Sequence, residues 1–242
     1  MIMKEEKQYF IHEPFVGAGD FLRPASILDL FQDTAALHAR NLGIGYDDLL
    51  KLNLLWVVTN VEFELVGKLP EFGDEIIVKT WPLEKGKLEF KREYEITDLE
   101  GNLIIKGISS WFTIDAITHK LTKGDKVVYS GEYFNKTNYP DYKRFKIDTE
   151  VKGSEVLEWQ YKVLYTDLDH NNHMNNARYL DIIYNKRLLT NITELKRIKI
   201  SYEHEILYDE IIDMKYIKNN KEHTFVGCVN GTECFTVLME EK

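Results

Sequence analysis

The chain has 242 residues, of which 44% are hydrophobic and 29% charged, a composition typical of a globular protein with one large domain or two smaller ones. Its 31 basic and 40 acidic residues give a net charge of −9, which argues against nucleic-acid binding through the overall field of the protein. No apolar run reaches the ~18 to 20 residues that a membrane span needs. The charged N-terminus has no apolar signal core, so we expect a cytoplasmic protein.

The first half of the chain is expected to form one helix and several strands. A short strand is predicted over Tyr9–Val16, and a helix begins at about Ser26, where Asp29 completes a capping-box-like start. We expect this helix to stop at Gly43. Four apolar or alternating runs predict strands at Leu54–Leu65, Asp74–Trp81, Leu88–Asp98 and Leu103–Ile114. The turn residues of segment 98–102 predict a hairpin between the last two.

The second half repeats this order, with a strand over Val156–Tyr165, a helix from about Asn176 to Leu189, and further strands. Local matches support a duplication: Val61-Glu62-Phe63-Glu64 resembles Ile200-Ser201-Tyr202-Glu203, and Asp74-Glu75-Ile76-Ile77 recurs as Asp209-Glu210-Ile211-Ile212. Each unit then has one helix and about five or six antiparallel strands. A sheet wrapped around an amphipathic helix buries the apolar face of that helix. The expected fold is α+β, a tandem hotdog.

The expected boundaries follow from composition. We assign residues 1–135 to the N-terminal hotdog unit and 153–242 to the C-terminal unit. The charged segment 136–152, which contains Pro140, is the expected linker.

The two cysteines are expected to stay reduced. Cys228 and Cys234 flank an Asn230-Gly231 turn, whose register pairs Cys228 with Glu233 and Cys234 with Gly227. The thiols would then project from opposite faces of the hairpin, which excludes a disulfide between them. Reduced cysteines agree with a cytoplasmic location.

A polar cluster stands between the second unit's first strand and its helix. Segment 165–179 holds two aspartates, two histidines and four asparagines. Helix capping accounts for Asn175 or Asn176, but not for the whole set, and the corresponding loop at 17–24 lacks the His and Asn residues. Asp169, Asn171 and His173 alternate, so in an extended loop their side chains would point the same way. A histidine or carboxylate can take a proton from water and an amide can orient that water, as hydrolysis of an activated acyl group requires.

Metal binding is the competing chemistry. His170 and His173 with Asp167 or Asp169 are potential ligands, but no third His or Cys lies at a characteristic spacing. We therefore expect neither a metal nor a cofactor. On the later strand, alternation from Tyr202 places His204 on the same face and Glu203 with Glu205 on the other.

The cluster carries a specific resemblance. Asp167-Leu168-Asp169-x-Asn171-x-His173-x-Asn175-Asn176-x-x-Tyr179 resembles the signature of acyl-ACP thioesterases, the plant plastid enzymes and their bacterial relatives. Further points of similarity lie in the first half, at Leu55-Trp56-Val57, Gly73-Asp74, Trp81, Arg92 and Trp111. The resemblance extends in order over nearly the whole chain. Because no transit peptide is seen, the chain looks like a bacterial member.

The resemblance implies a tandem hotdog that hydrolyses the thioester of fatty acyl-ACP in fatty acid biosynthesis. It places catalytic roles on Asp169, Asn171 and His173, and on Glu205 after the second helix. Many plant members have a cysteine directly after that glutamate, whereas this chain has Ile206, so a Cys-His pair cannot operate here. We expect attack by water, with Glu205 or His173 as the base, Asn171 orienting the reacting groups and Asp169 holding the geometry.

The resemblance further implies that the first unit helps to form the acyl-chain pocket. Trp56, Asn175 and Asn176 are candidate substrate-binding residues, although Trp56, Trp81 and Trp111 are each read first as sheet-packing residues. Four other histidines without polar neighbours in sequence are expected to be structural or exposed: His12, His38, His119 and His223.

The expected partner is an acidic acyl carrier protein, so a chain of charge −9 must either tolerate repulsion or present a local basic surface. The segment between Asn176 and Ile200 carries six bases against two acids. The candidate carrier contacts are Arg178, Lys186, Arg187, Lys196 and Arg197. Other readings stay open: an acyl-CoA thioesterase, a hotdog hydratase, and a non-catalytic acyl-thioester-binding protein. A homodimer is also left open.

Overall fold

The computed structural model describes residues 2–150, 155–189 and 192–242. The first half contains the elements β1 (Ile2–Met3), β2 (Glu5–Phe10), α1 (Pro24–Asn41), α2 (Tyr46–Lys51), β3 (Leu54–Leu65), β4 (Glu75–Pro82), β5 (Phe90–Thr97), β6 (Leu103–Asp115), β7 (Leu121–Thr122) and β8 (Glu132–Tyr133). The second half contains β9 (Glu155–Lys162), α3 (Arg178–Tyr184), β10 (Leu195–Tyr202), β11 (Ile211–Asn219), β12 (Glu222–Val229) and β13 (Thr232–Glu241). Single 3-10 turns occupy Glu13–Phe15, Gly124–Lys126, Tyr165–Asp167 and Ile192–Glu194.

One antiparallel sheet runs through both halves, in the strand order β2-β4-β5-β6-β3-β10-β13-β12-β11-β9. The first five strands come from the first half and the last five from the second, and the pairing of β3 with β10 joins them. Val61 lies opposite Ile200 at this junction, and these are two residues that the internal repeat aligns. The predicted α+β tandem arrangement is therefore confirmed, with corresponding strands of the two units meeting edge to edge.

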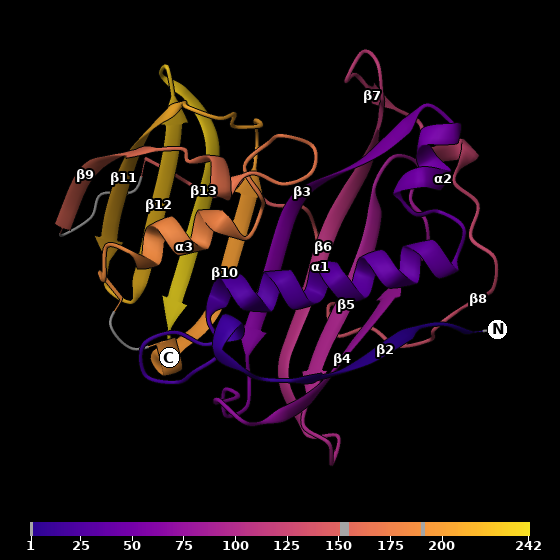
Figure 1. Cartoon of the computed structure of the whole chain (residues 1–242), viewed down its shortest axis with the longest axis horizontal. Coiled ribbons are helices and arrows are strands. Elements are labelled where there is room, and N and C mark those ends of the chain that lie inside the picture. Colours follow the sequence, from indigo (N-terminus) through magenta and orange to yellow (C-terminus); the bar gives the residue numbers. More distant parts are fainter. Residues whose placement is uncertain (1, 151–154, 190–191) are drawn as a thin grey trace.

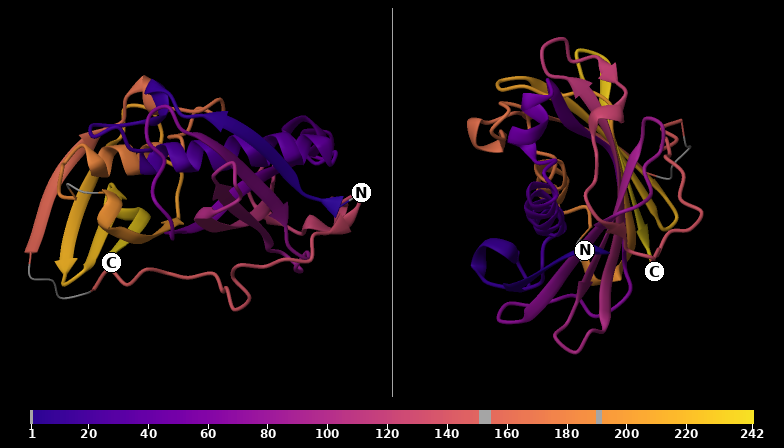
Figure 2. Two further views of the ribbon diagram at one scale, coloured as in Figure 1. Left: turned by 90° about the horizontal axis from the view of Figure 1, so that it is seen from below. Right: turned by 90° about the vertical axis from the view of Figure 1, so that its right-hand side faces the viewer.

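The helices α1 and α3 lie on the same side of the curved sheet (Figures 1 and 2). The apolar face of α1 buries Ile27, Leu30 and Phe31, each of which contributes roughly 1.5 to 3 kcal/mol to stability. The ring of Phe31 lies so close to Gly107 of β6 that an added Cβ there would come within 2.6 Å of it. Position 107 therefore needs glycine for α1 to sit this deep on the sheet.

The second helix is much shorter than predicted. Instead of running from Asn176 to Leu189, α3 has seven residues, ends at Tyr184 and continues as turns. Arg187 adopts a positive φ of 55°, which a right-handed helix does not allow. In the first unit, the helix starts at Pro24 rather than at Ser26, and the Ser26 hydroxyl is buried without a hydrogen-bond partner. The expected capping box is therefore wrong, since Pro24 at the first helical position defines the start.

Most strand boundaries agree with the sequence patterns, and β3 spans Leu54–Leu65 as predicted. The predicted range of the first strand is wrong, because β2 ends at Phe10 and Pro14 lies in the 3-10 turn that follows. The hairpin at Gly101 forms, with the Asp98 N–H donating to the Asn102 carbonyl at 3.1 Å. The late hairpin pairs Cys228 with Glu233 as expected, but a bulge pairs Gly227 with Phe235 rather than with Cys234.

The segment after β8 runs along the outer side of the first unit's sheet, opposite α1 (Figure 2). Its backbone is hydrogen-bonded there: the Trp81 indole N–H donates to the Lys136 carbonyl at 3.0 Å, and the Asn138 N–H donates to Glu93 at 2.8 Å. Residues 136–150 of the proposed linker are thus held on the sheet, and positions 151 and 152 lie outside the described residues. Within the described ranges, no helix is long and apolar enough to cross a membrane.

Candidate active site

A turn between β9 and α3 carries most of the predicted catalytic residues, and Asp167 anchors it. The Asp167 carboxylate accepts hydrogen bonds from the Tyr161 hydroxyl and the Leu164 N–H, both at 2.8 Å. Its main-chain carbonyl accepts from the Asn175 N–H, also at 2.8 Å. Asp167 therefore ties the beginning of the polar segment to its end.

The residues from Asp169 to His173 form a tight turn rather than the expected extended loop. The Asp169 N–H donates to the His173 carbonyl at 2.8 Å, and the Asn172 N–H donates to the Asp169 carbonyl at 3.1 Å. Asn172 has a positive φ of 63°, which asparagine tolerates better than most residues. The argument from alternation is wrong in its geometry, because side-chain to main-chain bonds of Asp favour a turn here.

The Asp169 side chain organises this turn. One carboxylate oxygen accepts from the Asn171 N–H at 2.8 Å and lies 3.4 Å from the His173 N–H, while the Asn171 amide lies 3.5 Å from the other oxygen. The Asp169 carboxylate thus faces the backbone of both neighbouring candidates.

His173 and Glu205 come together although they are 32 positions apart: the imidazole Nε2 lies 3.3 Å from a Glu205 carboxylate oxygen. Glu205 follows the end of β10, and the Met174 N–H donates to the Ile206 carbonyl at 2.8 Å, which holds the two segments in register. The His173 side chain is 24% exposed and that of Glu205 46%, so the pair is open to solvent. The strand ends at Tyr202, so the predicted alternation of faces through Glu205 does not apply.

Asn175 and Asn176 lie at the start of α3. The Asn175 side-chain oxygen accepts from the Ala177 N–H at 2.8 Å, in the manner of a helix cap. Asn176 is exposed, and its main-chain carbonyl accepts from the Tyr202 hydroxyl at 2.9 Å.

The first unit also reaches this turn. The ring of Tyr46, at the start of α2, packs edge-on against His170 with centroids 5.0 Å apart. Two residues before Tyr46, the carbonyl of Ile44 accepts from the Trp56 indole at 3.0 Å. Trp56 in turn packs against Phe90 in a separate apolar cluster of the first unit. The candidate catalytic turn is thus connected to that cluster through α2.

The first unit contains a turn with the same hydrogen bonds but different side chains. The Gly17 N–H donates to the Phe21 carbonyl at 3.1 Å, as Asp169 does to His173, and Asp20 has the same positive φ of 63° as Asn172. In this alignment Gly17, Gly19 and Phe21 occupy the positions of Asp169, Asn171 and His173.

A further bond extends the correspondence to the fourth residue. The Leu22 N–H donates to the Pro70 carbonyl at 2.9 Å, as Met174 does to Ile206. Leu69 therefore stands where the second unit has Glu205. Both units therefore contain the same backbone arrangement, but only the second unit has the polar side chains of the candidate site.

Half-buried charges join the helices next to the catalytic turn. Arg178 donates to Asp29 of α1 at 2.6 Å and also to Asp181, and Asp181 accepts from Arg23 at 3.0 Å. Burial raises the pKa of the Asp181 carboxyl, and the charges of Arg178 and Arg23 oppose that rise. Arg178, predicted as a carrier contact, is thus bonded within the protein.

Comparison with known proteins places this arrangement in a family. Two family profiles match, the acyl-ACP thioesterase N-terminal domain at residues 4–131 and the acyl-ACP thioesterase C-terminal domain at residues 150–230. The chain belongs to the acyl-ACP thioesterase family. Among curated proteins it is 28% identical to the acyl-[acyl-carrier-protein] hydrolase FATB3 of Cuphea viscosissima over 203 residues, 78% of this chain and 48% of that protein.

A second curated relative is the chloroplastic palmitoyl-acyl carrier protein thioesterase of Arabidopsis thaliana. It is 27% identical over 213 residues, which are 81% of this chain and 51% of that protein. The chain therefore spans about half the length of these family members.

Solved structures of the family share the fold. An acyl-ACP thioesterase from Bacteroides thetaiotaomicron superposes with a TM-score of 0.85 at 20% identity, covering 99% of this chain and 98% of that one. The 12:0-ACP thioesterase from Umbellularia californica gives a TM-score of 0.82 at 17% identity, covering 99% and 97%.

The family's cysteine position is occupied by Ile206, which is fully buried. Cys228 and Cys234 are both free thiols in the late hairpin, and burial raises the pKa of each. Neither therefore has the lowered pKa of an activated thiol. Within the residues that the structure describes, no group of three or more His, Cys, Asp or Glu side chains could hold a metal ion.

Sequence reasoning missed several residues that shape the site. Tyr46 and Asp29 belong to the other unit, and no local pattern marks them, whereas Asp167 stood inside the recognised motif. The side chains of three of the four histidines without polar neighbours in sequence have a hydrogen-bond partner, and His12 Nδ1 lies 3.0 Å from the Phe10 carbonyl. His38 lies 3.0 Å from the Arg92 guanidinium, and His223 lies 2.9 Å from the Tyr216 hydroxyl.

Proposed function

We propose that this chain hydrolyses the thioester of a fatty acyl chain carried by acyl carrier protein, releasing the free fatty acid and holo-ACP. The observation that carries the proposal is the 3.3 Å approach of His173 to Glu205 beside Asn171, in a chain of the acyl-ACP thioesterase family. The site needs no second copy of the chain, because both hotdog units are present in one. The two unbridged cysteines support a reducing compartment such as the cytoplasm.

The proposed reaction is direct attack by water. The water oxygen bonds to the thioester carbonyl carbon while its proton passes to the His173–Glu205 pair, and either member can accept it. The Asn171 amide, whose N–H groups are hydrogen-bond donors, orients the reacting groups. The C–S bond then breaks, and the proton held by the pair passes to the departing sulfur. Asp169 acts on this step only as a positioning residue, through its bonds to the turn.

We further propose that the N-terminal unit, residues 1–135, holds the acyl chain. The link from His170 through Tyr46 and α2 to Trp56 supports an entry from the site into the apolar cluster around Phe90. Trp56 would then line that path rather than only pack the sheet. Asn175 and Asn176 would contact the substrate nearer the thioester, although the Asn175 side chain is also engaged in capping.

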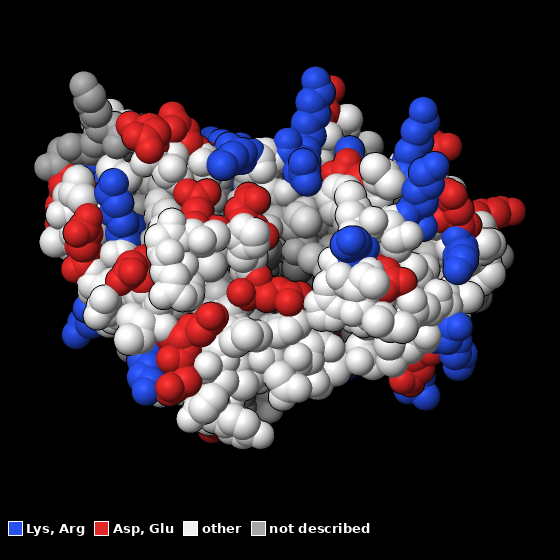
Figure 3. Space-filling view, turned by 90° about the horizontal axis from the view of Figure 1, so that it is seen from above, with Lys and Arg blue, Asp and Glu red and all other residues white. Residues whose placement is uncertain are grey.

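The acidic carrier would meet the bases that follow α3. Lys186, Arg187 and Lys196 are exposed, whereas Arg197 is held by two hydrogen bonds of 2.7 Å to Glu240. We therefore propose that the first three make the carrier contact, and that Arg178 and Arg197 support the structure beneath it. Figure 3 shows acidic side chains gathered near the middle of one face and basic ones mostly toward its edges, so a carrier would need such local basic positions.

A thiol-release assay on a panel of acyl-ACPs of different chain lengths tests this function. Release of one free thiol per acyl group consumed is expected, with acyl-ACP favoured over the matching acyl-CoA. Equal or better turnover of acyl-CoA would favour an acyl-CoA thioesterase. Loss of a double bond without thiol release would favour a hydratase, and binding without either reaction would favour a non-catalytic acyl-thioester-binding protein.

A further inference from the structure

The first unit's counterpart of the catalytic site contains a small apolar cavity. Phe21 and Leu69, which stand at the positions of His173 and Glu205, both line a cavity of about 300 Å³, together with Leu65. Leu65 and Leu69 are buried. A volume of this size lies at the lower end of the range in which proteins bind small molecules.

Residues of the second unit contribute to this cavity, as Tyr46 of the first unit contacts the candidate catalytic turn. Thr193 of the 3-10 turn after α3 lines it, along with Lys242. On the catalytic side, the equivalent neighbour is Tyr46 of α2, the element that follows α1. The cavity therefore lies at the first unit's equivalent of the candidate catalytic turn, with Phe21 and Leu69 at the positions of His173 and Glu205.

Lys68, Lys242 and Glu71 give the cavity a charged rim, with two basic side chains and one acidic one. Lys68 has a side chain that is 79% exposed, and its Nζ pairs with Glu71 at 2.9 Å. Lys242 Nζ donates to the Thr193 carbonyl at 2.8 Å. An exposed ion pair such as that of Lys68 with Glu71 is weak, so another carboxylate can compete for this ammonium group.

We propose that this cavity is a second, non-catalytic binding site for an aliphatic carboxylate, a free fatty acid of medium chain length. The alkyl chain would lie against Phe21, Leu65 and Leu69, and the carboxylate would bind Lys68 at the rim. The ligand class matches the product named under the proposed function, and the inference rests on that function only in this respect. Binding itself can be measured without hydrolysis.

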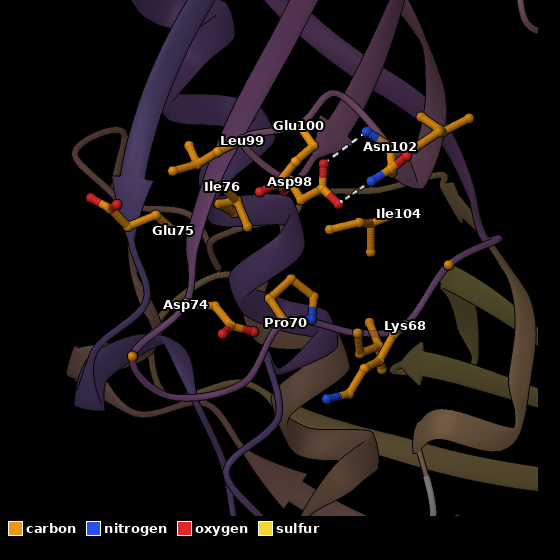
Figure 4. Close-up of a pocket in the computed structure, with 14 residues that line it drawn as sticks. Lys68, Pro70, Asp74, Glu75, Ile76, Asp98, Leu99, Glu100, Asn102 and Ile104 are labelled. Atoms are coloured by element: carbon orange, nitrogen blue, oxygen red, sulfur yellow. Dashed lines mark hydrogen bonds between the residues drawn. The ribbon is translucent and has the colours of Figure 1, made fainter.

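The neighbouring cavity supports the choice of this site for an anion. It has a volume of about 450 Å³ and shares the segment 67–69 with the smaller one. Four carboxylates line it, those of Asp74, Glu75, Asp98 and Glu100 (Figure 4). Their charge disfavours a carboxylate ligand there, so a fatty acid would bind on the Phe21 side of the segment.

Titration of decanoate into the His173→Ala variant, with and without Lys68→Glu, tests the proposal. We expect Lys68→Glu to weaken binding by about tenfold, because it replaces one attraction by one repulsion. Lys51→Glu is the matched control, since Lys51 is also highly exposed and pairs with an acid three positions away, Asp48. It should change decanoate binding little. Lys68→Glu should leave the thiol release of the otherwise unchanged protein intact.

Two further measurements locate the ligand. Leu69→Trp fills the cavity and should abolish this binding, and decanol should bind wild type more weakly than decanoate does. A photoactivatable decanoate analogue should label segment 65–71. Absence of binding, equal effects of Lys68→Glu and Lys51→Glu, or labelling only outside segment 65–71 would overturn the proposal. These outcomes do not depend on whether the chain releases thiols from acyl-ACP, so failure of either proposal can be recognised separately.

Discussion

Arg178 of α3 donates to Asp29 of α1 across the boundary between the two units, at 2.6 Å. Both side chains are partly exposed, at 25% and 35%. Because α3 follows the catalytic turn directly, this bond fixes the end of the turn against the helix of the other unit. A second bond across the same boundary runs from Arg23 to Asp181.

Asp29→Asn should therefore lower the rate of hydrolysis without touching the reacting groups. We expect a loss of about 1 to 2 kcal/mol in stability, less than for a fully buried pair because solvent screens these charges. The maximal rate should fall severalfold, while the KM for a small thioester stays nearly unchanged. Urea unfolding and steady-state kinetics measure the two effects. Asp48→Asn, which removes an exposed pair with Lys51, is the control, and equal effects of both variants would contradict the positioning role.

His173→Ala, Asn171→Ala and Glu205→Ala should each reduce turnover by a factor of roughly 10² to 10⁴, the usual contribution of a general acid–base group. The fold should persist, since all three side chains lie on a partly exposed surface. Thiol release and circular dichroism measure the outcome. His204→Ala, one position from Glu205 and exposed, should retain turnover. Near-normal rates in any of the first three variants would remove that residue from the proposed chemistry.

Blocking both cysteines should leave the enzyme active. Burial raises the pKa of Cys228 and Cys234, so neither supplies a reactive thiolate at neutral pH. Treatment with iodoacetamide, followed by mass spectrometry and the thiol-release assay after removal of excess reagent, checks this expectation. A Cys228→Ser, Cys234→Ser double variant should behave like the wild type. Inactivation that follows the extent of alkylation while the fold persists would point to a thiol in the mechanism.

Reversing Lys186, Arg187 and Lys196 to glutamate should raise the KM for acyl-ACP, mainly at low salt, where charge attraction acts over a longer range. Turnover of a small acyl thioester without the carrier should change little. Arg197 is left unaltered, because its reversal would break the pair with Glu240. Lys143→Glu, an exposed change on the outer segment, is the control. Equal losses on both substrates would exclude these bases from carrier binding.

Acid should destabilise the fold through His38. Burial, and secondarily the charge of Arg92, lower its pKa from 6.5 to about 4. Between these values the unfolded chain binds a proton that the folded chain does not. The free energy of unfolding is therefore unaffected by His38 protonation above pH 6.5. As the pH falls from 6.5 toward 4, this protonation lowers the free energy of unfolding by up to about 1.4 kcal/mol per pH unit. His38→Gln should flatten this loss in urea unfolding at pH 7 and pH 5. A slope as steep as in wild type would contradict the assignment, and exposed His204→Gln serves as control.

Much of the fold could be predicted because its signals are local. The apolar and alternating pattern predicted β3 with its observed bounds, Leu54–Leu65, and turn residues predicted the hairpins at Gly101 and Gly231. The short α3 could not be read in this way, since segment 176–189 has helical composition while Arg187 adopts a positive φ. The bulge beside Cys228 depends on packing between strands, which pattern alone does not encode.

In the candidate site, too, the residues that are close in sequence could be predicted and the contacts between the two units could not. Asp169, Asn171 and His173 stand together in sequence and were recognised, together with Glu205 through the family resemblance. The contacts from Tyr46 and Asp29 were not, because they cross the boundary between units and depend on how two helices and a sheet meet. The alternation argument predicted the wrong geometry for these residues: a turn held by the Asp169 carboxylate, rather than an extended strand, brings them together.

The pairing of Val61 with Ile200 has a consequence for how the two halves can change. In an assembly of two identical chains, each substitution appears on both sides of the axis, so a site cannot be altered on one side alone. In this chain the two residues that face each other where β3 pairs with β10 are encoded separately. A change at Phe21 leaves His173 as it was, and one at Leu69 leaves Glu205. Because both units belong to one chain, the turn at 17–21 and the turn at 169–173 can be substituted independently of each other.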